Sequence, residues 1–234
     1  MSDESICHML MRAHPELADA VDTPLDSSSV VGLLRLRAST SAEQPALWQL
    51  TPQGTWVSNT WGEYLQAVAA VATGFAQLGL QRGERVGIMA PSCREWDYAQ
   101  LGAMAAGGVA VGLDVHAVDE HLQKMALDCE LAGVVLSHPA MLERLGEAVR
   151  RRLRFVVILQ ASAPREFVAF DKLLRTPVLG NSWDKSHPGD IAAVVFSSGT
   201  TGAPKGIAYS HRQMCQAVLS IVSAHPTMCE GTRL

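Results

Sequence analysis

The sequence predicts an α/β fold, a layered and mostly parallel sheet with flanking helices. Short apolar runs alternate with amphipathic segments from about residue 60 onward, and short links join them, which is the pattern of βαβ units. Hydrophobic residues make up 48% of the 234 residues and charged residues 18%, so the chain has ample material for a buried core. No internal repeat or low-complexity tract interrupts the pattern. We therefore expect a sheet of buried strands with helices on its faces.

The overall composition argues against some classes of partner. The formal net charge is −4 and the pI is about 6.0, which disfavours a nucleic-acid-binding surface. Five scattered cysteines form no metal-ligand spacing and indicate reduced thiols. The longest uncharged apolar run, 101–113, is shorter than the roughly 20 residues of a spanning helix, and the N-terminus lacks a signal-peptide pattern. We expect a cytoplasmic protein without a transmembrane span, with peripheral membrane contact left open.

The first elements are expected to precede the sheet. Residues 1–29 contain prolines and a serine run that interrupt any long period, so they predict an irregular leader. A helix is expected over 30–39. The runs 45–50 and 55–60 flank the turn sequence Thr-Pro-Gln-Gly, which predicts a β-hairpin.

The strongest helix signal begins at Thr60. Thr60 and Glu63 have the spacing of a capping box, and apolar residues follow with a 3.6-residue period up to Gly79, a residue type that ends helices. Residues 176–189, with two prolines and two glycines, predict a surface connection. Between and around these segments, buried strands are expected over 84–90, 109–113, 133–137, 154–159 and 190–196, and helices over 94–106, 118–131, 139–152 and 165–175.

A polar loop follows the last of these strands and ends near a lysine. Its glycines allow backbone N–H groups to approach an oxygen closely, its hydroxyls can rotate, and its ammonium group can follow a phosphate. A phosphate site is one interpretation and an exposed linker is the other, and composition alone does not separate them. The candidate phosphate-binding residues are Ser197, Ser198, Gly199, Thr200, Thr201, Gly202 and Lys205.

This loop differs from a Walker A loop around its lysine. Lys205 follows Pro204 and precedes Gly206, where a Walker A loop has glycine before the lysine and serine or threonine after it. The next residues are strand-like, and a helix is expected only from His211 or Arg212. We therefore expect a loop that joins two strands, with no helix dipole behind a bound anion. A P-loop NTPase is a disfavoured alternative.

The segment FSSGTTGAPKG, residues 196–206, closely resembles the phosphate-loop motif of the acyl-adenylate-forming enzymes, the AMP-dependent synthetase and ligase superfamily. The run from "TWGEY" through "CREW", followed by a small-residue helix and "GGVAVGLDV", is similar to the N-terminal part of their large domain. Glu95-Trp96 and "YSHRQM" resemble the long- or medium-chain fatty acyl-CoA synthetase branch. The resemblance implies that residues 30–234 are an incomplete N-terminal portion of the AMP-binding large domain.

The resemblance also implies a two-step reaction and its cofactors. A carboxylic acid, by resemblance a fatty acid, attacks the α-phosphate of ATP to give an acyl-AMP and pyrophosphate, and the thiol of CoA then displaces AMP. The loop residues named above would hold the β- and γ-phosphates, with Mg²⁺ sharing their charge. The hydroxyl of Ser197 is the candidate magnesium contact.

Parts of the family's catalytic machinery are absent from this sequence. The acidic motif YGxTE is missing, since no Tyr-Gly pair occurs, and no lysine follows Lys205. We therefore expect no catalytic residue and no synthetase activity in the isolated chain, and a truncated sheet that a protein partner would cover. A non-catalytic short isoform, acting as an interaction or regulatory module, is the alternative.

The remaining candidates are expected to have structural roles. His211 is left open between lining the acyl or nucleotide pocket and capping or packing at a helix start. Glu95 is expected to face solvent or to cap a helix. Three aromatic residues are expected in the core, and three histidines without a second ligand at metal spacing are expected at surface or packing positions. These residues are Trp61, Phe75 and Trp96, and His116, His121 and His138.

Overall fold

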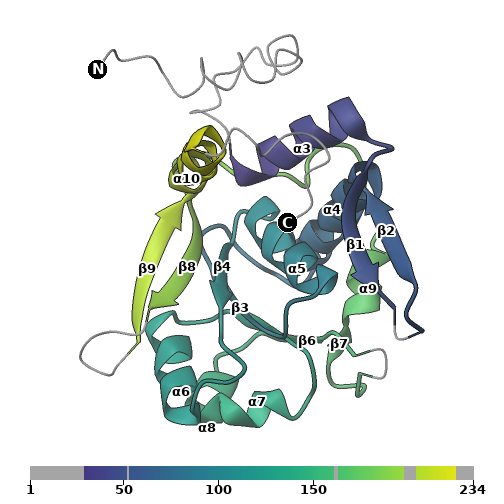
Figure 1. Cartoon of the computed structure of the whole chain (residues 1–234). Coiled ribbons are helices and arrows are strands. Elements are labelled where there is room, and N and C mark those ends of the chain that lie inside the picture. The colour runs from purple at the N-terminus through teal and green to yellow at the C-terminus, as the bar shows by residue number, and fades with distance from the viewer. Residues whose placement is uncertain (1–28, 52, 161–162, 198–203, 225–234) are drawn as a thin grey trace, which may run out of the picture.

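The computed structural model describes residues 29–51, 53–160, 163–197 and 204–224. Its centre is a seven-stranded sheet with the strand order β7-β6-β5-β3-β4-β8-β9 (Figure 1). The strands pair in parallel except for the last pair, β8 and β9, which is antiparallel. The predicted α/β class with a mostly parallel sheet is therefore confirmed. The strands are β3 (Arg85–Met89), β4 (Val109–Gly112), β5 (Gly133–Leu136), β6 (Phe155–Ile158), β7 (Val168–Ala169), β8 (Ile191–Ser197) and β9 (Lys205–Ser210).

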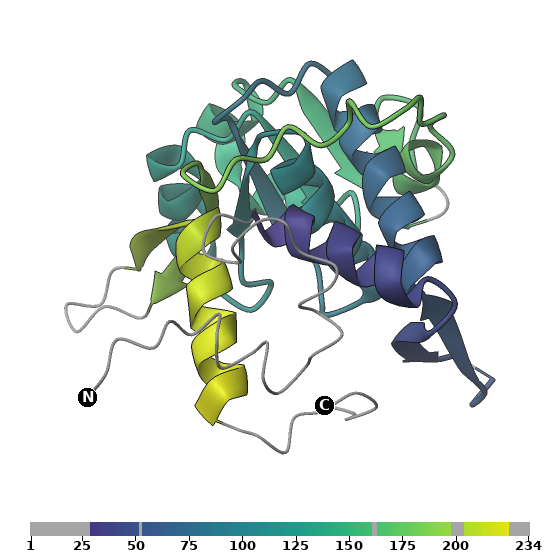
Figure 2. The same cartoon turned by 90° about the horizontal axis from the view of Figure 1, so that it is seen from above.

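Helices cover both faces of the sheet. One group packs into the larger core cluster and consists of α3 (Val30–Ser41), α4 (Trp61–Gln77), α5 (Arg94–Ala105) and α9 (Phe170–Leu174). The second group lies over the other face and consists of α6 (Asp119–Asp128), α7 (Met141–Arg144) and α8 (Gly146–Arg150) (Figures 1 and 2). Alternate residues of a buried strand point to opposite faces, which is why two separate core clusters flank one sheet.

A hairpin and a helix lie at the margins of this body. Strands β1 (Pro45–Leu50) and β2 (Trp56–Thr60) form the predicted antiparallel hairpin as a separate two-stranded sheet. Helix α10 (His211–Ala224) follows β9 directly and projects from that end of the sheet (Figure 2). Among the described helices, none combines the length and the hydrophobicity needed to cross a bilayer.

The local signals of α4 are confirmed in detail. The Thr60 hydroxyl accepts a hydrogen bond from the Glu63 N–H, and the Glu63 carboxylate accepts one from the Thr60 N–H, which completes the capping box. The helix ends at Gln77, and Gly79 takes a φ of 87°, the left-handed conformation that glycine adopts without strain. Its neighbour α5 approaches closely at Gly102, where a Cβ atom would lie 2.5 Å from Val71 Cγ1.

Two predicted helices were wrong in extent. The helix expected over 139–152 is broken into α7 and α8 at Gly146, which has a φ of 73°. The helix expected over 165–175 is a short strand, β7, followed by the five residues of α9, because Val168 and Ala169 pair with β6 instead of continuing a helix. The leader 1–29 lies outside the described residues except for Ser29, whose hydroxyl caps α3 by accepting from the Gly32 N–H.

Candidate functional site

The predicted phosphate loop is closed by the β8–β9 hairpin. Ser197, the last residue of β8, is the register partner of Lys205, the first residue of β9, and both are exposed. Ser198, Gly199, Thr200, Thr201 and Gly202 lie outside the described residues. Because Lys205 begins a strand and helix α10 begins only at His211, the expected strand-to-strand connection is confirmed. This arrangement rules out a Walker A geometry, in which the lysine opens a helix.

The parallel strands bring Ser197, where the loop begins, to the carboxyl edge of the sheet. Strand β8 pairs in parallel with β4 through Ala110–Ala193 and Val111–Val194 only, and β4 pairs in parallel with β3. The carboxyl ends of these strands therefore share one edge, where α/β sheets bind ligands. Val195–Ser197 extends past the end of this pairing, up to the residue where the loop begins.

A cleft of about 250 Å³ opens at this edge, directly before Ser197. Strands β3, β4 and β8 form its floor, α5 contributes Trp96 and Gln100, and α6 contributes Met125. The chain leaves β3 for α5 on one face and β4 for α6 on the other face, so the cleft lies where successive connections change sides. Phe196 also lines the cleft, so the cleft extends to the residue directly before Ser197.

The geometry resolves the role of His211, which the sequence left open. The side chain is 1% exposed, and Nδ1 accepts a hydrogen bond of 3.3 Å from the Val30 N–H. Ser210, and not His211, caps α10, because its hydroxyl accepts from the Gln213 N–H. Burial lowers the pKa of His211, while the carboxylates of Asp190 and Asp184 oppose that shift. His211 is therefore a packing residue that joins α10 to α3, and the packing interpretation is the one supported.

The other candidates mostly take the expected places. Phe75 is fully buried, and Trp61 and Trp96 are half-buried against the same core. Glu95 forms an ion pair with Arg94 at 2.7 Å. The three histidines outside the site are exposed or half-buried, and the described residues contain no cluster of three histidine, cysteine or acidic side chains that could hold a metal. These histidines are His116, His121 and His138.

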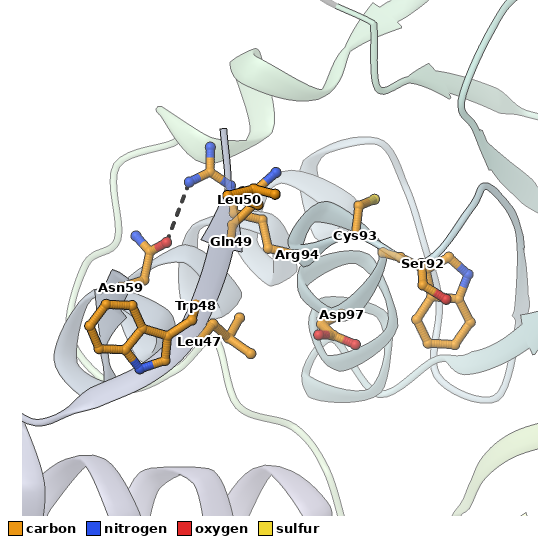
Figure 3. Close-up of a pocket in the computed structure, with 10 residues that line it drawn as sticks. Leu47, Trp48, Gln49, Leu50, Asn59, Ser92, Cys93, Arg94 and Asp97 are labelled. Atoms are coloured by element: carbon orange, nitrogen blue, oxygen red, sulfur yellow. Dashed lines mark hydrogen bonds between the residues drawn. The ribbon is translucent and has the colours of Figure 1, made fainter. Parts of the chain in front are cut away.

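A second pocket, of about 600 Å³, was not predicted from the sequence (Figure 3). It lies between β1, which contributes Leu47, and the start of α5, where Cys93 and Asp97 line it. The Arg94 guanidinium donates a 3.3 Å hydrogen bond to Asn59 Oδ1, which links α5 to the hairpin, and burial raises the pKa of the Asp97 carboxyl. The start of a helix directly after a buried strand is a sequence signal that could have indicated the α5 side of this pocket. The β1 side could not be predicted, because the hairpin is distant in the sequence and reaches the pocket only through tertiary packing.

Magnesium is the metal that the phosphate loop could share with a nucleotide. It prefers oxygen ligands and keeps several waters, so one protein hydroxyl together with phosphate oxygens is a suitable ligand set. Ser197 offers such a hydroxyl at the exposed end of β8. Among the residues that the structure describes, no group of three or more histidine, cysteine or acidic side chains offers an all-protein metal site beside it.

Comparisons with known proteins agree with this geometry. Residues 34–232 match the family model described as AMP-binding enzyme. The long-chain-fatty-acid–CoA ligase ACSBG1 of Bos taurus is 30% identical over 169 residues, which are 68% of this chain and 23% of that protein. The long-chain-fatty-acid–CoA ligase FadD15 of Mycobacterium bovis is 29% identical over 203 residues, 80% of this chain and 32% of that protein. The chain thus spans about a quarter to a third of the length of these relatives.

Solved structures show the same architecture. The anthranilate CoA ligase AuaEII, determined in complex with anthranoyl-AMP, superimposes with a TM-score of 0.69 and 27% identity, covering 82% of this chain and 36% of that one. Acetoacetyl-CoA synthetase from Streptomyces lividans gives a TM-score of 0.71 at 21% identity and covers 86% of this chain and 32% of that one, a likeness of fold alone.

Proposed function

The chain belongs to the family of AMP-binding enzymes, and on this premise we propose that it forms the phosphate-binding part of an AMP-forming fatty acyl-CoA synthetase. Residues 30–234 would constitute the N-terminal portion of the large nucleotide-binding domain. The complete reaction would join a fatty acid to CoA. The carboxylate oxygen attacks the α-phosphorus of ATP and pyrophosphate leaves. The CoA sulfur then attacks the acyl carbon and AMP leaves.

The single observation that carries this proposal is the β8–β9 hairpin at the carboxyl edge of the parallel strands. Its two ends, Ser197 and Lys205, are register partners, so a hydroxyl and an ammonium group flank one mouth of the loop. A compact cation on a flexible stem suits the leaving pyrophosphate, whose charge rises as the bond to the α-phosphorus breaks. The adjacent cleft gives the rest of a bound ligand room beside the loop.

In this proposal the residues at the hairpin have distinct roles. Lys205 would neutralise the β- and γ-phosphates, and the loop residues Ser198, Gly199, Thr200, Thr201 and Gly202 would donate hydrogen bonds to them. Ser197 would contribute one oxygen to magnesium shared with the phosphates. Bound Mg²⁺ supplies charge neutralisation at those phosphates.

The hairpin supplies charge on one side of the transferred group only. A transition state is stabilised over the ground state when groups complement the charge that develops at both the attacking and the leaving oxygens. In the described part of the chain, no acidic cluster accompanies the hairpin to complete a magnesium site. We therefore propose that this chain alone binds nucleotide without catalysing acyl transfer.

Equilibrium binding of ATP in the presence of Mg²⁺ tests the phosphate role directly. Substitution Lys205→Ala removes the ammonium group from an exposed strand end, and we expect ATP affinity to fall about ten-fold or more, the loss of one charge-assisted hydrogen bond. Lys172→Ala, which removes an exposed lysine on α9 at the other end of the sheet, is the matched control and should leave affinity unchanged. Equal affinity in the Lys205→Ala protein would refute the phosphate site.

A non-catalytic nucleotide-binding module is the second candidate, favoured by the one-sided placement of charge at the hairpin. Exchange of labelled pyrophosphate into ATP, driven by added fatty acid, tests whether this chain alone can catalyse adenylation. Exchange by this chain would assign it the adenylation step itself and would contradict the argument from one-sided charge. ATP binding without exchange is expected of both candidates.

A further inference from the structure

The pocket of about 600 Å³ beside the β1–β2 hairpin has no part in the proposed nucleotide chemistry (Figure 3). Its volume lies in the range of about 300–1,000 Å³ that is typical of small-molecule sites, which are mostly apolar and contain a few polar groups that orient the ligand. Leu47, Trp48 and Leu50 of β1 form one wall. Trp96 of α5 lines the pocket and also the cleft beside Ser197, so the two share one residue.

The carboxylate of Asp97 is an unpaired charge in this pocket. Asp97 lies on α5, across the open space from Leu47 of β1, and is half-buried (Figure 3). In the described part of the chain, no group donates a hydrogen bond to this carboxylate or forms an ion pair with it. Burial raises the pKa of Asp97, and no neighbouring cation opposes that shift. The carboxylate has therefore lost water without gaining a partner.

The other groups at this end of α5 do not neutralise Asp97. The Arg94 guanidinium also lines the pocket, but it is paired with Glu95 at 2.7 Å and donates to Asn59 Oδ1 at 3.3 Å. The helix dipole favours a carboxylate near the start of a helix, yet no described N–H group of this first turn donates to Asp97. The pocket therefore keeps one uncompensated negative charge.

We propose that this pocket binds a small organic cation, a primary amine with an apolar body, whose ammonium group pairs with Asp97. An unpaired charge held away from water is costly, and a cationic ligand would remove that cost on binding. Cations also interact favourably with indole rings, and Trp48 and Trp96 both line the pocket. The negative charge disfavours a carboxylate or a phosphate here, so the ligand differs in charge from the substrates of the proposed reaction.

Isothermal titration calorimetry of the wild-type chain with three matched probes tests the proposal. Phenethylamine, 2-phenylethanol and 3-phenylpropionate share a phenyl ring and a two-carbon link, and at pH 7.5 they are a cation, a neutral molecule and an anion. We expect phenethylamine to bind about ten-fold or more tightly than 2-phenylethanol, the gain of one charge-assisted hydrogen bond, and 3-phenylpropionate to bind most weakly. No binding of phenethylamine, or equal binding of the amine and the alcohol, would overturn the proposal.

Substitution Asp97→Asn tests the anchoring carboxylate. Asparagine has nearly the same shape and removes an unpaired charge, so the variant should fold, and its affinity for phenethylamine should fall about ten-fold or more. Asp128→Asn is the matched control, because Asp128 is exposed on α6 at the opposite face of the sheet, and it should bind phenethylamine like the wild type. Retained affinity in Asp97→Asn, or an equal loss in the control, would refute the pairing with Asp97.

Two hairpin variants test where the ligand lies. Trp48→Leu removes an aromatic ring from the pocket wall and should weaken phenethylamine binding about two- to five-fold. Trp56→Leu changes a tryptophan of β2 that is 61% exposed and does not line the pocket, so it should leave affinity unchanged. Unchanged affinity in Trp48→Leu, or a larger loss in Trp56→Leu, would contradict this placement. The titrations contain no ATP, so their outcome is independent of the proposed nucleotide site.

Discussion

Protonation of His211 should destabilise the protein as the pH falls below about 6.5, the ordinary pKa of histidine. The neutral imidazole is 1% exposed, and Nδ1 accepts a hydrogen bond from the Val30 N–H at 3.3 Å. Protonation would convert this acceptor into a donor facing another donor. The carboxylates of Asp190 and Asp184 favour the charged form and His187 disfavours it, but burial is the largest cause and lowers the pKa of His211.

The sign and the size follow from proton linkage. Since the pKa of His211 is lower in the folded protein than in the unfolded chain, the unfolded chain binds more protons between the two values. The stabilisation is complete above the unfolded pKa and is lost as the pH falls through the folded pKa. One excess proton gives a slope of at most about 1.4 kcal/mol of unfolding free energy per pH unit.

Urea unfolding at several pH values between 8 and 5 measures this slope. His211→Gln keeps an oxygen acceptor near Val30 but does not titrate, so its unfolding free energy should depend less steeply on pH by up to about 1.4 kcal/mol per unit. His138→Gln, at an exposed histidine, is the matched control substitution. Identical slopes for wild type and His211→Gln would refute the assignment of a buried neutral imidazole.

Two further predictions concern packing. Gly102→Val would place Cβ 2.5 Å from Val71 Cγ1, so α4 and α5 must separate, which lowers the unfolding free energy by about 1–3 kcal/mol. Gly189→Val serves as the control, because its Cβ would have no neighbour closer than 3.6 Å. An unchanged urea midpoint for Gly102→Val would contradict this close approach. Burial raises the pKa of Cys215 to about 11, so only about 0.1% of this thiol is thiolate at pH 8. Iodoacetamide should therefore modify Cys215 only in urea. Rapid labelling of Cys215 in the folded protein, detected by mass mapping, would show that the thiol is accessible.

Local patterns predicted the elements whose signals are complete within a short segment. The capping box and 3.6-residue period predict α4, and the strand-like residues after Lys205 correctly predict that a strand, β9, follows the loop. The break at Gly146 was missed because its left-handed φ of 73° accompanies contact with Gln123 of α6, where a Cβ atom would lie 2.9 Å from the side chain. Such a contact has no signal in the segment 139–152 itself.

The site was predicted only in part for a similar reason. Sequence reasoning proposed Ser197 and Lys205 as phosphate ligands, because the loop composition is concentrated in one segment. The structure pairs these two residues across β8 and β9, and their phosphate role stays a prediction. The environment of His211 depends on the N–H of Val30, which is distant in the sequence, and on Asp190, which lies directly before β8. The pocket around Asp97 similarly needs the β1–β2 hairpin to pack beside α5. Interactions across such separations carry no periodicity that a single sequence could display.

The buried contact at His211 also determines where Lys205 points. A slip of one residue in an antiparallel pair would turn every side chain of β9 to the opposite face, and Lys205 would then leave the side of the loop that Ser197 occupies. At the end of β9 away from the loop, the His211 N–H donates to the Asp190 carbonyl at 3.0 Å, and the Arg212 N–H donates to the Pro188 carbonyl at 2.9 Å. These bonds hold the strand in one register, and the burial of the His211 ring makes any shift costly. The orientation of Lys205, the proposed phosphate ligand, is therefore fixed at the opposite end of its own strand.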